Sequence, residues 1–299
     1  MARIGKKPIS LYLWAEFEEV GSRNKFDNIM IFSFITRMSI LFTVGLVVFL
    51  WVLGGSPLFA QEISVLSYNI HHCNPPSKPG FIDVEAIAKV IRESGADLVA
   101  LQEVDVYTER SGKSLHQAEK LGELTGMYWY FYKSIDHAGG EYGNALLSKF
   151  PISAKGGFSL PNDPDTEPRT AVFIDIELPG GKEITFAGTH LEFKREEVTL
   201  RQAKAIVAFF EDRSPKPIIL AGDFNAEVTM SPMVYLDSHF QRPCTENCAP
   251  TIPQVNPQKE IDFVMVKPKE AFVVTSHEVI NESYASDHLP VLVNFQVNK

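Results

Sequence analysis

Residues 217–227 read PIILAGDFNAE, an apolar run that ends in polar side chains. The segment Ile218–Ala221 predicts a buried β-strand, because it is short, apolar and followed directly by a glycine. Asp223 and Asn225 come next, and side chains alternate across a strand, so both are expected to face the same way. The alternative is an Asx turn, in which the Asp223 side chain bonds to the backbone two residues later.

Other apolar runs repeat this pattern, with polar residues where each run begins or ends. Asn69 follows ISVLSY, Glu103 follows DLVALQ, His190 follows ITFAGT, Asp262 opens the run FVMV, and Asp287 and His288 precede the last run. Binding and catalytic groups commonly collect at one end of a sheet, and an antiparallel strand starts at the edge where its neighbour ends. We therefore expect these side chains to share one site.

Strands and helices alternate from Gln61 onward. Helices are predicted at Val84–Ile91, capped by Asp83 and ended by Gly95, from a capping box at Ser114–Gln117 to about Gly126, and at Thr199–Phe210. Strands are predicted at Ile63–Tyr68, Leu98–Leu101, Tyr128–Tyr132, Ala145–Ser148, Ala171–Leu178, Glu183–Ala187, Ile218–Ala221, Phe263–Val266, Phe272–Thr275 and Val291–Phe295. Some connections are hairpins, such as Gly180-Gly181, and others are helices, which predicts an α/β domain of two packed sheets with outer helices.

The first sixty residues are typical of a targeting segment. Ile40–Leu53 is an uncharged apolar run preceded by Arg37, and Ala60 precedes a polar stretch. These features predict a secretory signal cleaved after Ala60, which places the protein in the periplasm or outside the cell. An uncleaved membrane anchor is the alternative, although the run is short for a spanning helix. Residues 1–60 are thus predicted to be an N-terminal extension, and residues 61–299 the catalytic domain.

Composition limits the function classes. The 299 residues are 45% hydrophobic and 22% charged, which is ordinary for a globular protein. The net charge is −9, so the chain lacks the basic face expected of a protein that grips nucleic acid. Of three cysteines, Cys244 and Cys248 are close enough to bridge in an oxidising compartment, or they stay as two free loop thiols.

The polar residues at the strand ends suit a hard metal ion and a phosphoryl group. Mg²⁺ prefers oxygen ligands and often takes only one or two carboxylates, so Glu103 is the expected ligand, with Asn69 and Asp287 nearby. Mn²⁺ is the alternative cation. Each residue alone can be an ordinary helix cap or turn residue, and it is their joint occurrence that indicates a site.

The same residues also suit a hydrolytic mechanism. Asp223, held by Asn225, is the candidate base that activates a water for in-line attack on phosphorus. His190 and His288 are expected to donate hydrogen bonds to phosphoryl oxygens, while Asp262 fixes the tautomer of His288 and raises its pKa. The sequence has no Gly-x-Ser-x-Gly motif and no Gly-rich phosphate loop.

Seven segments together resemble the endonuclease/exonuclease/phosphatase superfamily: LSYNIHHC, ALQEVD, YGNALLSKFPI, GTHLEF, LAGDFNAE, EIDFVMV and SDHLPV. The resemblance extends from Ile63 to Phe295 and implies a four-layer αββα sandwich and Mg²⁺-dependent phosphoester hydrolysis. It implies Glu103, Asn69 and Asp287 at the metal, Asp223 as base, Asn225 and His190 at the phosphate, and Asp262 paired with His288. Arg169, in EPRTAV, either reaches the substrate or braces the sheet.

The chain also departs from part of this superfamily. Its abasic-site endonucleases carry an acidic residue two positions after the Asn, where this chain has His71, and their basic DNA-penetrating loops are not evident here. We expect an exported, monomeric, metal-dependent hydrolase acting on a small or lipid phosphoester, which contacts a membrane only through an uncleaved N-terminal segment. A secreted nuclease is the alternative, and a non-enzymatic surface-binding protein is a third reading.

Overall fold

The computed structural model describes residues 61–213 and 215–298. The predicted signal, its apolar run and the cleavage point after Ala60 lie outside these residues, so that prediction stays open. Within the described part, no helix has both the length and the apolar character needed to cross a membrane. The elements below all belong to one compact unit, Ala60–Lys299.

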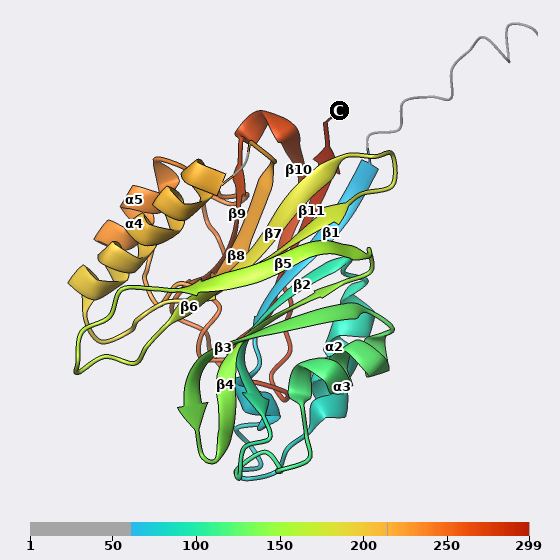
Figure 1. The fold of residues 1–299 in the computed structure, drawn as a ribbon, viewed down its shortest axis with the longest axis vertical. Coiled ribbons are helices and arrows are strands. Elements are labelled where there is room, and N and C mark those ends of the chain that lie inside the picture. Colours follow the sequence, from blue (N-terminus) through green and yellow to red (C-terminus); the bar gives the residue numbers. More distant parts are fainter. Residues whose placement is uncertain (1–60, 214, 299) are drawn as a thin grey trace, which may run out of the picture. The chain divides into compact units, whose positions relative to one another are not determined.

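Two mixed β-sheets form the centre of this unit (Figure 1). The larger sheet has the strand order β10-β11-β1-β2-β4-β3, and the smaller has the order β5-β6-β7-β8-β9. The strands are β1 (Gln61–Asn69), β2 (Leu98–Val106), β3 (Tyr128–His137), β4 (Gly140–Ser148), β5 (Ile152–Ser159), β6 (Thr170–Glu177), β7 (Glu183–His190), β8 (Ile218–Asp223), β9 (Asp262–Lys267), β10 (Phe272–Val279) and β11 (Val291–Val297). Every predicted strand is present, and most extend further than their apolar runs.

Helices lie outside both sheets, as Figure 1 shows for α2 and α3 on one side and α4 and α5 on the other. The helices are α2 (Val84–Ser94), α3 (Gln117–Thr125), α4 (Glu196–Arg213) and α5 (Ser231–Asp237), with short 3-10 turns η1 (His71–Cys73) and η2 (Lys269–Ala271). Three apolar layers result, one between the sheets and one under each helical layer. The predicted four-layer αββα sandwich is thereby confirmed.

Strand alternation explains why polar residues meet at one end of the inter-sheet layer. In β8, Ile219 and Ala221 point into that layer, while Ile218 and Leu220 face the helices. The next position that faces the partner sheet is therefore Asp223. The same parity directs Asn69 of β1, His190 of β7 and Asp262 of β9 toward the space between the sheets, where each strand leaves or enters the core.

Two local predictions were wrong. The cap of α3 is His116, whose Nδ1 accepts a hydrogen bond from the backbone of Glu119, so Ser114 does not cap the helix. Glu103 does not follow a strand but lies inside β2, which is longer than its apolar run because a bulge lets it continue past Leu101.

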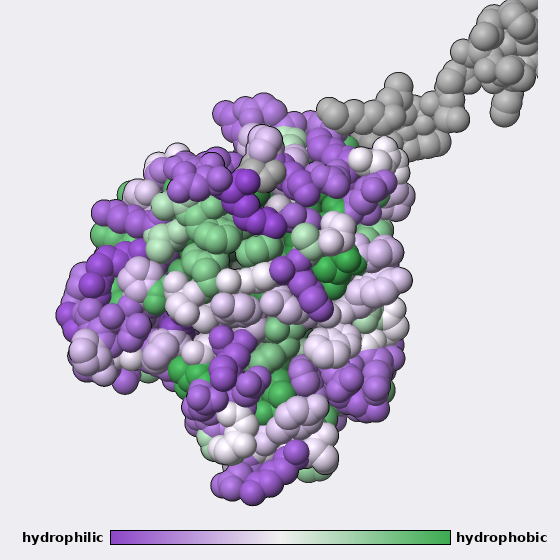
Figure 2. Space-filling view, in the orientation of Figure 1, coloured by the Kyte–Doolittle hydropathy of each residue, from purple (hydrophilic) through white to green (hydrophobic). Residues whose placement is uncertain are grey.

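Two elements were absent from the prediction, β5 and α5. β5 is an edge strand with no buried residue, so its sequence carries little hydrophobic alternation. On the face shown in Figure 2, a pale apolar strip lies between α4 and β5 and is bordered by hydrophilic residues. Phe158 of β5 stacks on Phe209 of α4 at a centroid distance of 3.9 Å, which ties the edge strand to the helix layer.

Candidate active site

Three neighbouring strands of the smaller sheet place acid and imidazole side chains in one row. His190 of β7 is in register with Asp223 of the parallel strand β8, and Asp223 is in register with Asp262 of the antiparallel strand β9. All three side chains are buried. The predicted convergence of these residues at one sheet edge is therefore what the strand register produces.

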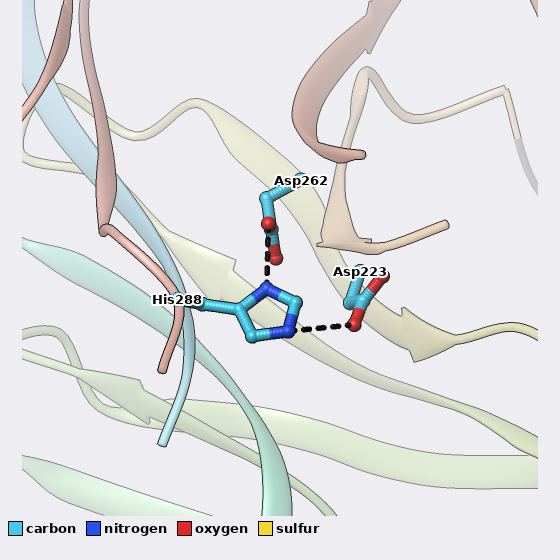
Figure 3. Close-up of side chains that lie close together, drawn as sticks. All are labelled: Asp223, Asp262 and His288. Atoms are coloured by element: carbon cyan, nitrogen blue, oxygen red, sulfur yellow. Dashed lines mark hydrogen bonds and ion pairs between the residues drawn. The ribbon is translucent and has the colours of Figure 1, made fainter. Parts of the chain in front are cut away.

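His288 lies between the two aspartates (Figure 3). Its Nδ1 donates to Asp262 Oδ2 at 2.8 Å, and its Nε2 lies 3.8 Å from Asp223 Oδ2. The hydroxyl of Thr251 donates to the same Asp262 oxygen at 2.6 Å. Asp262 thus fixes the orientation of the His288 ring, and the other ring nitrogen faces Asp223.

Burial and mutual charge set the protonation of this trio. Burial raises the pKa of Asp223 and the nearby Asp262 charge raises it further, while the His288 cation offsets part of this, which leaves a pKa of about 7. Burial alone would lower the pKa of His288, but the charges of Asp262 and Asp223 outweigh it and raise that pKa to about 10. Near neutral pH, a cationic imidazole therefore faces a carboxyl group that is poised to exchange a proton.

His190 has the opposite electrostatic environment. Arg169 Nη1 lies 2.9 Å from His190 Nδ1, and an arginine can only donate, so Nδ1 accepts and the ring proton is on Nε2. That Nε2 lies 3.4 Å from Asp223 Oδ2. Burial and the Arg169 charge lower the pKa of His190 well below its usual range, which keeps the ring neutral. Arg169 is itself buried, so it braces His190 in this structure.

Asn225 lies beyond the end of β8, so strand alternation does not set the direction of its side chain. Its backbone has a φ of 49°, and its N–H donates to Asp223 Oδ1 at 2.9 Å, which is the Asx turn. Its side-chain amide instead donates to the carbonyl of Leu191 at 2.9 Å, in the segment after β7. Asn225 therefore holds the Asp223 carboxylate through its backbone and ties β8 to the segment that follows His190.

The larger sheet contributes Asn69 and Glu103 to the same space. The Asn69 amide donates to Asp223 Oδ2 at 3.0 Å and to Glu103 Oε1 at 3.2 Å, so it bridges carboxylates from both sheets. Its Oδ1 accepts from the backbone of His71. Glu103 has a φ of 60° at the β2 bulge, and bulges beside active sites commonly redirect a side chain in this way.

Glu103 remains ionised in this setting. Burial would raise its pKa, but the His72 side chain, the other nearby imidazoles and the Asn69 amide outweigh burial and hold the pKa well below its usual range. Asp287 is half-buried and joins the group through Ser286. The Ser286 hydroxyl lies 2.7 Å from the backbone carbonyl oxygen of Asn69 and 3.3 Å from Asp287 Oδ1. The three predicted metal ligands are thus linked by hydrogen bonds through Asn69.

The donor set suits a divalent cation. Asp223, Asp262 and His288 have ligand atoms that all lie within 4.8 Å of one another, so the described residues include a possible acidic metal site. The His288–Asp262 hydrogen bond already occupies one nitrogen of that trio. Glu103 is ionised, and Asn69 in its present rotamer offers it an amide N–H, so Asn69 has to turn its amide over to present an oxygen ligand.

Two residues of this site were not predicted. Thr251 lies in the irregular loop before β9, where nothing in the sequence distinguishes it from other loop hydroxyls. Gln102 is fully buried next to Glu103 and, among the described residues, neither of its amide atoms has a hydrogen-bond partner. The sequence could have indicated Gln102, because it is a polar residue in an apolar run, directly before Glu103.

A family model described as Endonuclease/Exonuclease/phosphatase family matches residues 66–288, which span every residue of the site just described. The chain belongs to this family. Members of the endonuclease/exonuclease/phosphatase family hydrolyse phosphoester bonds, and they generally use divalent metals. No curated protein matches the chain at a significant level.

Solved structures show the family's fold in the same arrangement. An endonuclease/exonuclease/phosphatase from Beutenbergia cavernae is 23% identical with a TM-score of 0.66, covering 80% of this chain and 72% of that one. A mannosyl-6-phosphatase from Bacteroides thetaiotaomicron is 21% identical with a TM-score of 0.64, covering 78% and 99%. The human Nocturnin catalytic domain, solved with a bound sulfate anion, is 21% identical with a TM-score of 0.62, covering 79% and 95%. At these identities the likeness extends to the fold alone.

Proposed function

We propose that this chain is an exported, metal-dependent phosphoester hydrolase that directs a water in line at phosphorus, with a small or lipid phosphoester as substrate. One observation carries the proposal: Asp262, His288 and Asp223 form a buried series of contacts. The Asn69 amide links this series to the ionised Glu103 of the other sheet. A base with a pKa of about 7 and an imidazolium with a pKa of about 10 are both in their working forms in the neutral to alkaline range.

Asp223 acts as the general base. Its Oδ1 accepts from the Asn225 backbone, so the carboxylate is held in place, and its Oδ2 takes the proton of the attacking water. Because Asp223 is buried and its pKa lies near neutrality, it is a stronger base than an exposed aspartate. General-base help of this kind accelerates a reaction by roughly 10²–10⁴-fold.

The two histidines stabilise negative charge on the phosphoryl oxygens. His288 does so as a cation supported by Asp262, and His190 does so as a neutral ring that presents its Nε2–H. Fixed donors in a site shielded from water cost little reorganisation during the reaction. Arg169 keeps the His190 tautomer, and Asn225 has a second amide hydrogen for the phosphate.

Mg²⁺ is the cation we propose, with Mn²⁺ as its substitute. Glu103 would hold it, with Asn69 after an amide turn and with Asp287. When bound, the cation polarises a phosphoryl oxygen and neutralises the charge that develops there.

The acidic balance of the chain supports a small or lipid phosphoester over nucleic acid. A net charge of −9 repels a polyanion, whereas a single phosphate group needs only the local donors described above. The mannosyl-6-phosphatase from Bacteroides thetaiotaomicron, which shares this fold, adds support by analogy. We propose that the enzyme acts as a monomer.

A disulfide supports export. Cys244 and Cys248 are bridged, which leaves the buried Cys73 as the free thiol of the described residues. Structural disulfides persist in oxidising compartments, which is where a protein with a cleaved signal would fold. The apolar run at Ile40–Leu53 supports the same location.

The deciding experiment is hydrolysis of a panel of phosphoesters with added Mg²⁺, Mn²⁺ or EDTA. The panel includes a sugar phosphate, a phospholipid, a small synthetic phosphodiester and duplex DNA. We expect turnover of a small or lipid ester that EDTA abolishes and added cation restores, and Glu103→Gln should need more cation. Full activity in EDTA after metal removal would refute the metal requirement, and a preference for DNA would favour the nuclease.

A further inference from the structure

His72 lies at this site and has no role in the mechanism above. It belongs to η1, which follows β1 after Ile70, and its side chain is only 13% exposed. His71, His72 and Cys73 have φ values of 45°, 43° and 58°, a left-handed conformation that three consecutive non-glycine residues rarely adopt. Such backbone strain persists where the surrounding structure enforces it.

The structure holds His72 in this conformation through its backbone. The amide of Gln117 donates to the His72 carbonyl at 2.7 Å, while the Gln117 carbonyl oxygen accepts from the backbone of Asp105 at 2.8 Å. Gln117 is fully buried, so the link from β2 to His72 is rigid. The imidazole is therefore positioned by contacts that do not involve its own ring nitrogens.

The His72 Nδ1 atom is buried and, among the residues that the structure describes, has no hydrogen-bond partner. It lies 3.9 Å from Glu103 Oε2, which is within reach of an ion pair with a protonated ring but too long for a hydrogen bond. A buried polar atom normally finds a partner, because leaving it unpaired costs about 1–3 kcal/mol. His71 differs, since its Nδ1 is already 2.8 Å from the Asn74 carbonyl.

One cation can satisfy both atoms. Nitrogen and oxygen ligands each lie about 2.0–2.2 Å from a bound divalent ion, so a single ion can bridge atoms separated by up to about 4 Å. The 3.9 Å separation between His72 Nδ1 and Glu103 Oε2 falls within that span. The Glu103 carboxylate supplies the negative charge that such a site needs.

We propose that His72 is a nitrogen ligand of the cation held by Glu103, which makes this a mixed nitrogen–oxygen site. The inference rests on the metal site of the proposed function and narrows its choice of ion. Imidazole is a good ligand for borderline cations, whereas Mg²⁺ is bound almost entirely by oxygen. His72 therefore shifts the preference of the site from Mg²⁺ toward transition-metal ions, for which Mn²⁺ serves as the probe.

The test compares His72→Asn with His71→Asn in the purified protein. Asparagine tolerates a left-handed backbone, and both positions share this conformation, so neither substitution adds backbone strain, while His71→Asn also removes the Nδ1 contact with the Asn74 carbonyl. Affinities are measured by titration with Mn²⁺ alone and Mg²⁺ alone, and the bound Mn²⁺ is examined by pulsed electron paramagnetic resonance for coupling to an imidazole nitrogen.

We expect wild type and His71→Asn to show nitrogen coupling and tighter binding of Mn²⁺ than of Mg²⁺. His72→Asn should lose the coupling and weaken Mn²⁺ binding by about 10–100-fold, while Mg²⁺ binding changes far less. Persistence of the coupling in His72→Asn, or equal losses for both cations, would overturn the role of His72. In either case Glu103→Gln should still weaken cation binding. A Glu103→Gln variant that binds both cations as tightly as wild type would show that Glu103 does not hold the cation.

Discussion

Asp223 is the residue at which contacts from both sheets meet. Its Oδ2 is approached by nitrogen atoms of Asn69, His190 and His288, and its Oδ1 accepts from the Asn225 backbone. Nevertheless its pKa is about 7, because burial and the Asp262 charge raise it. This combination of firm positioning and raised basicity is what a general base requires.

Replacing the Asp223 carboxylate should slow the chemical step and leave substrate binding nearly unchanged. Asp223→Asn keeps the shape of the side chain but cannot take a proton, so kcat should fall by roughly 10²–10⁴-fold with little change in KM. The control is Asp175→Asn, a buried carboxylate of β6 paired with Arg213 and Thr185, which should lose stability and keep kcat. Near-normal turnover by Asp223→Asn would assign the base elsewhere.

The pH–rate profile should have two limbs. Asp223 must be deprotonated, so the rate falls as pH drops through about 7, and His288 must be protonated, so the rate falls as pH rises through about 10. The Asp262 charge raises both pKa values, so Asp262→Asn should move both limbs to lower pH. The measurement is kcat against pH on one substrate at saturating cation, and an alkaline limb that stays in place would contradict the assignment to His288.

At this scale the sequence predicted which residue types gather, because strand parity and strand ends are visible in apolar runs. It did not predict that Asn225 turns its amide to the Leu191 carbonyl, since that depends on a φ of 49°. It also placed no weight on Thr251, whose partner Asp262 is near in space only because the preceding loop folds back.

Among the elements, the parallel pair β7–β8 sets the spacing of the active-site row. Gly222 precedes Asp223, and a Cβ built there would lie 2.1 Å from the Thr189 carbonyl oxygen of β7. Only glycine permits this close approach of the two backbones. The distance between His190 and Asp223 therefore depends on a residue that itself carries no chemistry.

Gly222→Ala should separate these strands and destabilise the domain by about 1–3 kcal/mol or more, because the obstacle is backbone. Urea denaturation measures the loss in free energy of unfolding. Gly188→Ala is the matched control in the same sheet, where the added Cβ meets the Leu146 side chain at 2.9 Å, and a side-chain end can move aside. A smaller loss in Gly222→Ala than in Gly188→Ala would show that β7 and β8 can part freely.

Element prediction succeeded where hydrophobic periodicity was strong and failed where it was weak. Helix α2 begins after Asp83 and ends at Gly95 as the sequence indicates, since cap and stop signals are local. The bulge in β2 is not local, because it arises from pairing with β4, so the sequence could not show that Glu103 lies within a strand.

For the molecule as a whole, the expected cleavage point lies directly before the first strand that the structure describes. β1 begins at Gln61 and is flanked by β11 and β2 in the larger sheet. A cut after Ala60 would leave this strand intact, whereas a cut several residues later would remove paired backbone. N-terminal sequencing of the exported protein should give a start near Gln61, and a chain that retains residues 40–53 would indicate an anchor.

The pairing of β1 with β11 has a further consequence for synthesis of the protein. Ile63 is in register with Phe295, so the first strand acquires its second neighbour only after almost the whole chain has left the ribosome. Pairings so distant along the chain form slowly. His288 stands immediately before that last strand, so its contacts with Asp262 and Asp223 also form only after the C-terminal segment has been made.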